Sequence, residues 1–198
     1  MKNIKIVPSK NKIIFAAFII ILGIIFRTVW HLGPNIEFVT AATLLAASYL
    51  GRKWAIIVPL SIMIITDFLI GNTNIYIFTW SAYAAIGIGA YYNLKFKILN
   101  LKYKIITAAV MGILASLWFY LWTNFGVWLT DSWGMYPKTL TGLFDAYILG
   151  LPFLRLNLIS TLVFVPLSFT IVEVGRSAKP LRCFVFTKFK RISRYGCN

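Results

Sequence analysis

Acidic residues are scarce in this sequence of 198 residues. Only five Asp and Glu stand against 20 Lys and Arg, and charged residues make up 13% of the chain. In soluble domains about a quarter of the residues are charged. Here 60% of the residues are hydrophobic and the mean hydropathy is +0.80. This composition excludes an ordinary soluble domain and predicts a membrane protein.

Groups that perform enzyme chemistry are scarce as well. Cys183 and Cys197 both lie in the basic C-terminal tail, form no metal-ligand pattern, and are expected to be free thiols on the reducing side of the membrane. The single histidine, His31, has no second ligand near it, and no G-x-x-x-x-G-K-[ST] phosphate loop occurs. We therefore expect no enzyme, no metal site and no cofactor.

The net charge of +15 would suit nucleic-acid binding, but the basic residues are confined to the tails and short loops. In the C-terminal tail they alternate with Phe and Tyr, which suits either an anionic lipid surface or simple topological anchoring. We expect the lipid bilayer, and no nucleic acid, as a partner.

Six apolar runs approach the ~20 residues that a helix needs to cross ~30 Å of hydrocarbon. They predict an all-α, polytopic six-transmembrane-helix bundle over residues 13–174, between an N-terminal tail (1–12) and a basic C-terminal tail (175–198). The expected spans are 13–30, 36–51, 54–70, 75–92, 105–129 and 153–174. The second span is the weakest because it is short. Residues 138–150 are expected to form a short helix or re-entrant piece, which Pro152 separates from the last span.

Basic residues also predict the orientation. On this map 17 of the 20 Lys and Arg fall on one side of the membrane, and only Arg27, Lys138 and Arg155 fall on the other. By the positive-inside rule both termini face the cytoplasm. We expect a multi-pass protein of the bacterial cytoplasmic membrane.

Polar residues gather at the outer ends of the expected spans. Four of the five acids, Glu37, Asp67, Asp131 and Asp145, fall there with the three outer cations, together with His31, Asn35, Thr40, Asn72, Asn74, Asn124 and Asn157. Ionisable groups inside a membrane cost ~2.5–3.5 kcal/mol each on the insertion scale, so they usually face a cavity or one another. We therefore expect Arg27 to be paired in the folded protein, with Glu37 and Asp67 nearby.

Helical spacing places several of these residues on shared faces. Tyr120, Asn124, Trp128 and Asp131 fall on one face of span 105–129 and its end, and Tyr76, Trp80, Tyr83 and Gly87 on one face of span 75–92. Such faces would form a small-molecule pocket with aromatic walls, although an aromatic belt at the membrane interface explains the same residues. The candidate substrate-binding residues are Arg27, Asp67, Trp80, Trp122, Asn124, Trp128 and Asp131. Loop 131–138 would act as a lid.

Four stretches resemble an uncharacterised family of small bacterial membrane proteins: RTVWHLGPNIEFVTAATLLA (27–46), DFLIGNTNIYIFTWSAYAAIG (67–87), WTNFGVWL (122–129) and MYPKTLTGLFDAYILGLPF (135–153). That family is usually grouped with the substrate-binding S components of energy-coupling-factor (ECF) vitamin transporters. The resemblance implies an outward-facing nutrient pocket and docking to a coupling protein driven by two ATPases. In one respect the sequence departs from S components, which often carry Ala-x-x-x-Ala on the first helix, because Ala16 is followed by Ile20.

Two functions are consistent with these observations. The first is a membrane subunit that binds a small, vitamin-like and aromatic nutrient for uptake, energised by a separate ATPase module. The second is a structural subunit of cell-wall or cell-shape machinery that binds other proteins and no ligand. In the second case the outer polar residues would pair internally.

The charge distribution predicts the outcome of cysteine labelling in intact cells. Cys197 should be protected from an impermeant thiol reagent, and a cysteine introduced by Ser132→Cys should react with it. The reverse labelling pattern would contradict the predicted orientation and move the polar residues to the cytoplasmic side.

Overall fold

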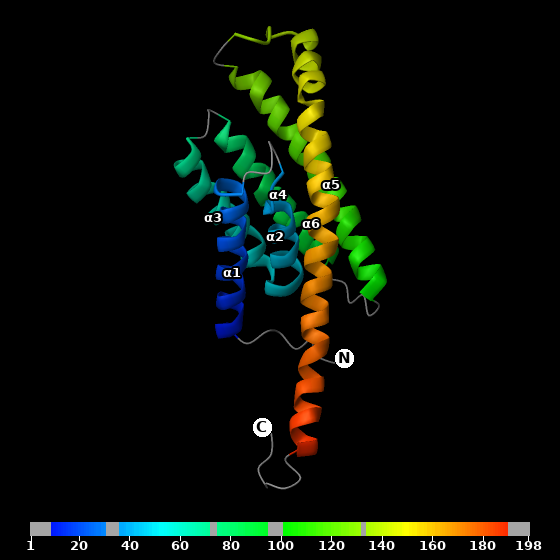
Figure 1. The fold of residues 1–198 in the computed structure, drawn as a ribbon. Helices are drawn as coiled ribbons and strands as arrows, with labels where there is room; N and C mark the ends of the chain where they lie inside the picture. Colours follow the sequence, from blue (N-terminus) through cyan, green and yellow to red (C-terminus); the bar gives the residue numbers. More distant parts are fainter. Residues whose placement is uncertain (1–8, 31–35, 72–74, 95–100, 132–133, 190–198) are drawn as a thin grey trace.

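A computed structural model describes residues 9–30, 36–71, 75–94, 101–131 and 134–189. All regular structure in these ranges is helical, as predicted. The elements are α1 (Ser9–Thr28), α2 (Val39–Leu45), the π-helical turn η1 (Ala46–Leu50), α3 (Arg52–Ile70), α4 (Tyr76–Leu94), α5 (Leu101–Thr130) and α6 (Leu140–Phe189). They pack as one bundle around α2 (Figure 1).

Two glycines delimit α3. Gly51 separates it from η1 with a φ of 102°, and Gly71 ends it in the left-handed conformation with a φ of 77°. Its amide donates to the Asp67 carbonyl at 3.0 Å. Glycine adopts positive φ without a Cβ penalty, so the chain turns sharply here and brings the end of α3 close to the start of α4.

The helix α2 and its continuation η1 form the centre of the bundle. Every residue of α2 is buried, and it contacts α1, α3, α4, α5 and α6. Ala42 and Ala46 are fully buried, which fits the close helix approach predicted from their spacing. Together α2 and η1 cover residues 39–50, about 18 Å at 1.5 Å per residue, and this is too short to cross a membrane.

The predicted count of six spans is therefore not supported. Four of the described helices are long and apolar enough to cross a membrane: α1, α3, α5 and the Leu140–Arg176 part of α6. The weak span 36–51 is a short apolar helix enclosed by protein, and α4 is not among the four. The structure is that of a helical membrane protein.

The predicted break at Pro152 is wrong, because α6 runs without interruption from Leu140 to Phe189. Its first turns, which we expected to form a separate short helix or re-entrant piece, pack along α5. A Cβ at Gly150 would overlap the Asn124 side chain, and the Ser116 and Thr161 hydroxyls lie 3.0 Å apart further along the interface. Tertiary packing of this kind supports a proline within a membrane helix.

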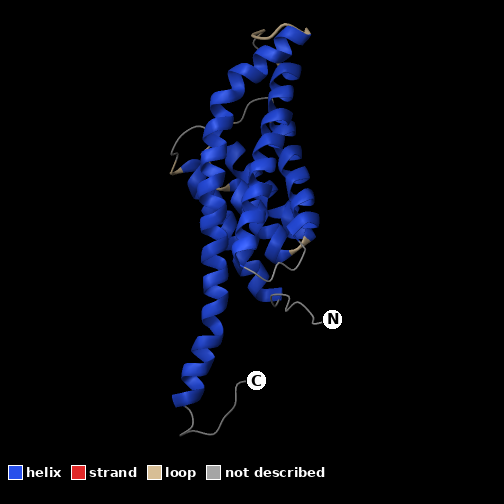
Figure 2. Cartoon of the chain, turned by 90° about the vertical axis from the view of Figure 1, so that its right-hand side faces the viewer, coloured by secondary structure: helices blue, strands red, loops and turns tan. Residues whose placement is uncertain are grey.

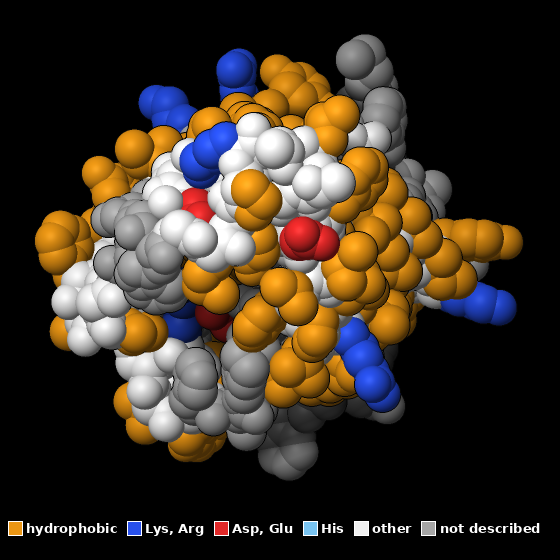
Figure 3. Space-filling view, turned by 90° about the horizontal axis from the view of Figure 1, so that it is seen from above, with side chains coloured by type: hydrophobic (Ala, Val, Ile, Leu, Met, Phe, Trp, Pro, Cys, Tyr) orange, Lys and Arg blue, Asp and Glu red, His pale blue; other side chains and the backbone are white. Residues whose placement is uncertain are grey.

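The α5–α6 hairpin extends past the ends of the other helices (Figures 1 and 2). The 50 residues of α6 correspond to about 75 Å, against about 30 Å for the 20 residues of α1. Seen from above, hydrophobic side chains surround an area of polar side chains and backbone, and the charged side chains are isolated (Figure 3).

The opposite end of the bundle has its own ion-pair cluster. Glu173 Oε1 lies 2.6 Å from Lys104 Nζ and 3.4 Å from Arg176 Nη1, and it accepts a hydrogen bond of 2.7 Å from the Tyr49 hydroxyl. These contacts hold the start of α5 and the end of η1 against α6. The helix α1 begins, and α6 ends, at this same end of the bundle (Figure 1).

Two neighbouring glycines on α4 test the packing of α3 against α4. A Cβ at Gly87 would overlap the Ala55 backbone, whereas a Cβ at Gly89 would meet nothing within 4 Å. We expect Gly87→Ala to destabilise the protein by about 1–3 kcal/mol, the range for overpacking, and Gly89→Ala to be neutral or slightly stabilising. Thermal unfolding in detergent measures both. Equal stability of the two variants would contradict this contact.

Candidate functional site

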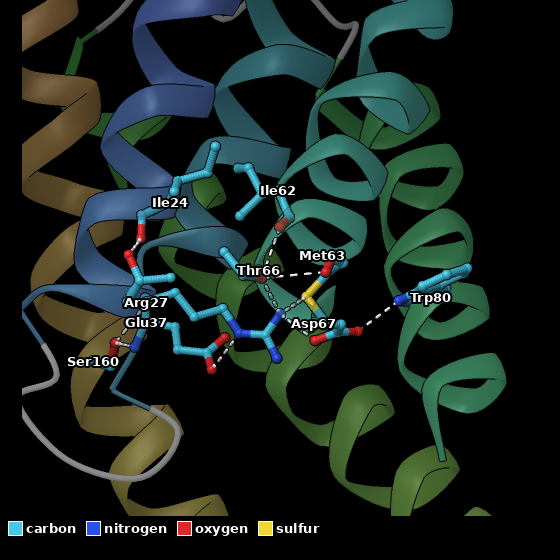
Figure 4. Close-up of polar contacts among 10 residues, drawn as sticks. Ile24, Arg27, Glu37, Ile62, Met63, Thr66, Asp67, Trp80 and Ser160 are labelled. Atoms are coloured by element: carbon cyan, nitrogen blue, oxygen red, sulfur yellow. Dashed lines mark hydrogen bonds and ion pairs between the residues drawn. The ribbon is translucent and has the colours of Figure 1, made fainter. Parts of the chain in front are cut away.

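Arg27, in the last turn of α1, is the centre of a buried polar network (Figure 4). Its Nε donates to Glu37 Oε1 at 3.1 Å, and its Nη1 lies 2.9 Å from Asp67 Oδ1 and donates to Thr66 Oγ1 at 2.7 Å. The Arg27, Glu37 and Asp67 side chains are 13%, 15% and 5% exposed. The predicted pairing of Arg27 with both acids is confirmed.

The network continues from α3 to α4 through Asp67. Its Oδ2 accepts a hydrogen bond of 2.7 Å from the Trp80 indole nitrogen. The Trp80 ring lies 5.2 Å from the ring of Tyr76, one turn earlier on α4, and Tyr83 on the following turn is buried. The predicted face is therefore directed toward α3 and the core at Trp80 and Tyr83, whereas Tyr76 is exposed.

Two contacts that fix the network were not anticipated from the sequence. Ser160 of α6 holds the backbone of Glu37, since its Oγ accepts from the Glu37 amide at 3.1 Å and donates to the Glu37 carbonyl at 3.0 Å. Met63 Sδ lies 2.9 Å from Arg27 Nη1. A serine or methionine within an apolar helix gives no sequence signal for such a role.

Trp122 lies on a different surface, in a row of aromatic rings. It stacks on Trp118 at 5.7 Å and on Phe125 at 5.9 Å, and it lies 5.6 Å from Phe78 of α4. Its indole donates to Ser81 Oγ at 2.8 Å, an exposed contact. This arrangement matches the aromatic-belt interpretation of the sequence.

Asn124 lies at the interface of α5 and α6. Its amide donates to the Tyr120 carbonyl at 2.8 Å, and its side chain fills the space beside Gly150. The Tyr120 hydroxyl in turn donates to the Tyr147 carbonyl of α6 at 2.6 Å. The face that carries Tyr120 and Asn124 is real, but these two side chains contact α5 and α6.

Trp128 and Asp131 fasten the connection between α5 and α6. The Trp128 indole donates to the Pro137 carbonyl at 3.1 Å, and Asp131 Oδ2 accepts from the Tyr136 amide at 2.7 Å. Lys138 Nζ donates to the Trp128 and Leu129 carbonyls at the end of α5. These contacts hold segment 134–138 against the helix end, whereas a lid would need to be released.

One apolar groove of about 290 Å³ lies between α4 and α5, lined by Ala85, Ile86, Gly89, Ala90, Met111, Leu114, Ala115 and Trp118. None of the seven candidate residues lines it. The described residues hold no group of three or more potential metal ligands. His31, Asn35, Asn72 and Asn74 lie outside the described residues.

Of the seven candidates, the structure brings together Arg27, Asp67 and Trp80. We define these three with Glu37 as the outer network. A comparison with protein families matches residues 8–181 to a family of unknown function, DUF6580. The chain belongs to this family. The match covers every described helix except the last residues of α6, and therefore the whole outer network. No curated protein and no solved structure matches the chain.

The outer network predicts a large effect of removing its cation. We expect Arg27→Leu to lower the free energy of unfolding by about 3–5 kcal/mol, because Glu37 and Asp67 would then be buried without a partner. The exposed Arg155 is the matched control, and Arg155→Leu should change stability by no more than about 0.5 kcal/mol. Denaturant titration in detergent measures both. Equal behaviour would mean that Arg27 only reaches toward the membrane interface.

Proposed function

We propose that this protein is a membrane-embedded subunit that binds a small, vitamin-like nutrient with an aromatic ring for uptake. A separate ATPase module supplies the energy. The proposal places the protein in the bacterial cytoplasmic membrane with both termini in the cytoplasm and the outer network facing outward. The resemblance to S components of ECF transporters motivates this assignment.

One observation carries the proposal: an arginine, two carboxylates and an indole converge in an otherwise apolar helix bundle. Each ionisable group in a membrane segment makes insertion of that segment into the bilayer less favourable, and apolar residues of similar volume often stabilise a core as well as a buried ion pair does. A network of this cost is typical of a binding site. Pockets for small molecules likewise combine apolar walls with a few convergent polar groups.

Within this site the residues have distinct roles. Trp80 offers a ring for stacking beside the carboxylate of Asp67, to which its indole is bonded. Glu37 and Arg27 are 15% and 13% exposed and so remain within reach of a ligand. Asn124, Trp128 and Asp131 are not part of this proposal, because their described contacts maintain the α5–α6 hairpin.

The coupling partner of such a subunit would dock differently from that of many S components. The first helix lacks Ala-x-x-x-Ala, and Ala16 is 1% exposed and belongs to the core. A partner helix therefore has no access to the small residue that begins this motif. An ECF coupling protein with its ATPases stays the proposed partner, bound through another face.

Native mass spectrometry of the full-length protein, purified from its own membranes, tests the proposal. We expect a co-purified small molecule that is retained in Trp118→Leu and lost in Trp80→Leu. Both variants remove one indole, but only Trp80 belongs to the outer network. Wild-type protein without any bound small molecule, or equal retention by the two variants, would contradict the proposal.

A scaffolding subunit of cell-wall or cell-shape machinery is the second candidate. The observation that favours it is the apolar surface of the hairpin, where Leu140, Phe144, Ile148 and Leu149 are 76%, 64%, 60% and 59% exposed. Internal pairing of Arg27 with two acids also fits this candidate. Crosslinking of the hairpin to wall-synthesis proteins, together with ligand-free wild-type protein, would favour the scaffold.

A further inference from the structure

We propose that the outer network selects a small organic cation, an ammonium or amidinium group attached to an aromatic or apolar body. This inference rests on the proposed function and names the substrate class of the same site. It follows from the charges, the burial and the neighbouring rings of the network.

The network has an excess of negative charge. It holds one guanidinium, that of Arg27, and two carboxylates, those of Glu37 and Asp67. One oxygen of each carboxylate lies within 3.1 Å of a guanidinium nitrogen. Its formal charge is therefore −1. In the part of the chain that the structure describes, neither acid forms an ion pair with another Lys or Arg. The other two described ion pairs belong to Glu173 at the opposite end of the bundle.

Such an excess is unfavourable where the side chains are buried. Solvent screens a charge poorly in a low-dielectric interior, so an uncompensated carboxylate attracts a cation strongly. Asp67 is the most buried of the three at 5% exposure, and its Oδ1 forms no hydrogen bond although it lies beside Arg27. A bound cation would supply the missing positive charge, whereas a bound anion would face two carboxylates.

Aromatic rings beside the carboxylate favour an organic cation over a metal ion. The Asp67 carboxylate accepts a hydrogen bond from the Trp80 indole. The centroid of the Tyr76 ring lies 5.2 Å from that of the Trp80 ring, and Tyr76 is 43% exposed. The carboxylate lies at the edge of the indole, whose N–H it accepts. An ammonium group bound to this carboxylate would lie close to the aromatic rings, which attract cations at their faces. A divalent metal would instead require a larger set of oxygen ligands, and the described residues contain no group of three or more His, Cys, Asp or Glu side chains that could supply it.

Three probes of one shape and different charge test this inference on the full-length protein in detergent or nanodiscs. Benzylamine is a cation at neutral pH, benzyl alcohol is neutral and benzoate is an anion. We expect saturable quenching of tryptophan fluorescence with benzylamine, with an affinity at least about tenfold above that of the other two. Trp80→Phe should reduce the quenching, which locates the probe at the outer network.

Asp67→Asn removes the excess charge while keeping an oxygen that can accept the Trp80 hydrogen bond. We expect it to lower the affinity for benzylamine by at least about tenfold and to abolish the preference over benzyl alcohol. Glu173→Gln is the matched control, because it removes one partly buried carboxylate at the other end of the bundle. It should leave benzylamine binding unchanged.

The outcomes separate this inference from the proposed function. Tighter binding of benzoate or benzyl alcohol, lost in Trp80→Phe, would overturn the cation class and leave the site in place. Absence of binding by all three probes, together with ligand-free protein in mass spectrometry, would overturn both. Unchanged benzylamine binding in Asp67→Asn would show that the probe binds elsewhere and would overturn the inference.

Discussion

The pairing of the Arg27 guanidinium with two carboxylates is the interaction on which the rest of this structure depends. It joins the end of α1 to Glu37 before α2 and to Asp67 at the end of α3. Asp67 extends the connection to Trp80 of α4, and Ser160 of α6 holds the Glu37 backbone. A guanidinium in a poorly solvated interior must be paired, so this one requirement sets the positions of five chain segments relative to one another.

The short helix α2 explains why these segments can converge. Because α2 and η1 together are only about 18 Å long and buried among the other helices, α2 can start deep within the bundle. The polar residues that precede it are thereby brought beside the ends of α1 and α3. At the other end of the bundle, Glu173 binds Tyr49 of η1 and Lys104 of α5. Apolar packing fills the space between these two polar clusters.

Polar side chains have different roles in the α5–α6 hairpin and in the outer network. The upper α5–α6 hairpin uses its polar side chains to satisfy its own backbone and its connection, as Asn124, Trp128 and Asp131 do. An unsatisfied polar group is costly in apolar surroundings, so these hydrogen bonds stabilise the hairpin. The outer network instead joins separate helices around one buried guanidinium, and this distinguishes it from the local contacts of the hairpin.

The sequence by itself determined the helical membrane class, the approximate bounds of most helices and the pairing of Arg27, because apolar runs and rare buried charges are local signals. Only the tertiary structure decided which of the apolar runs are long enough to span a membrane and whether Pro152 interrupts α6. Periodicity likewise placed Tyr120 and Asn124 on one face but did not identify the helix opposite. That depends on packing between residues distant in the chain, such as Asn124 against Gly150, and a helical repeat carries no information about its neighbour.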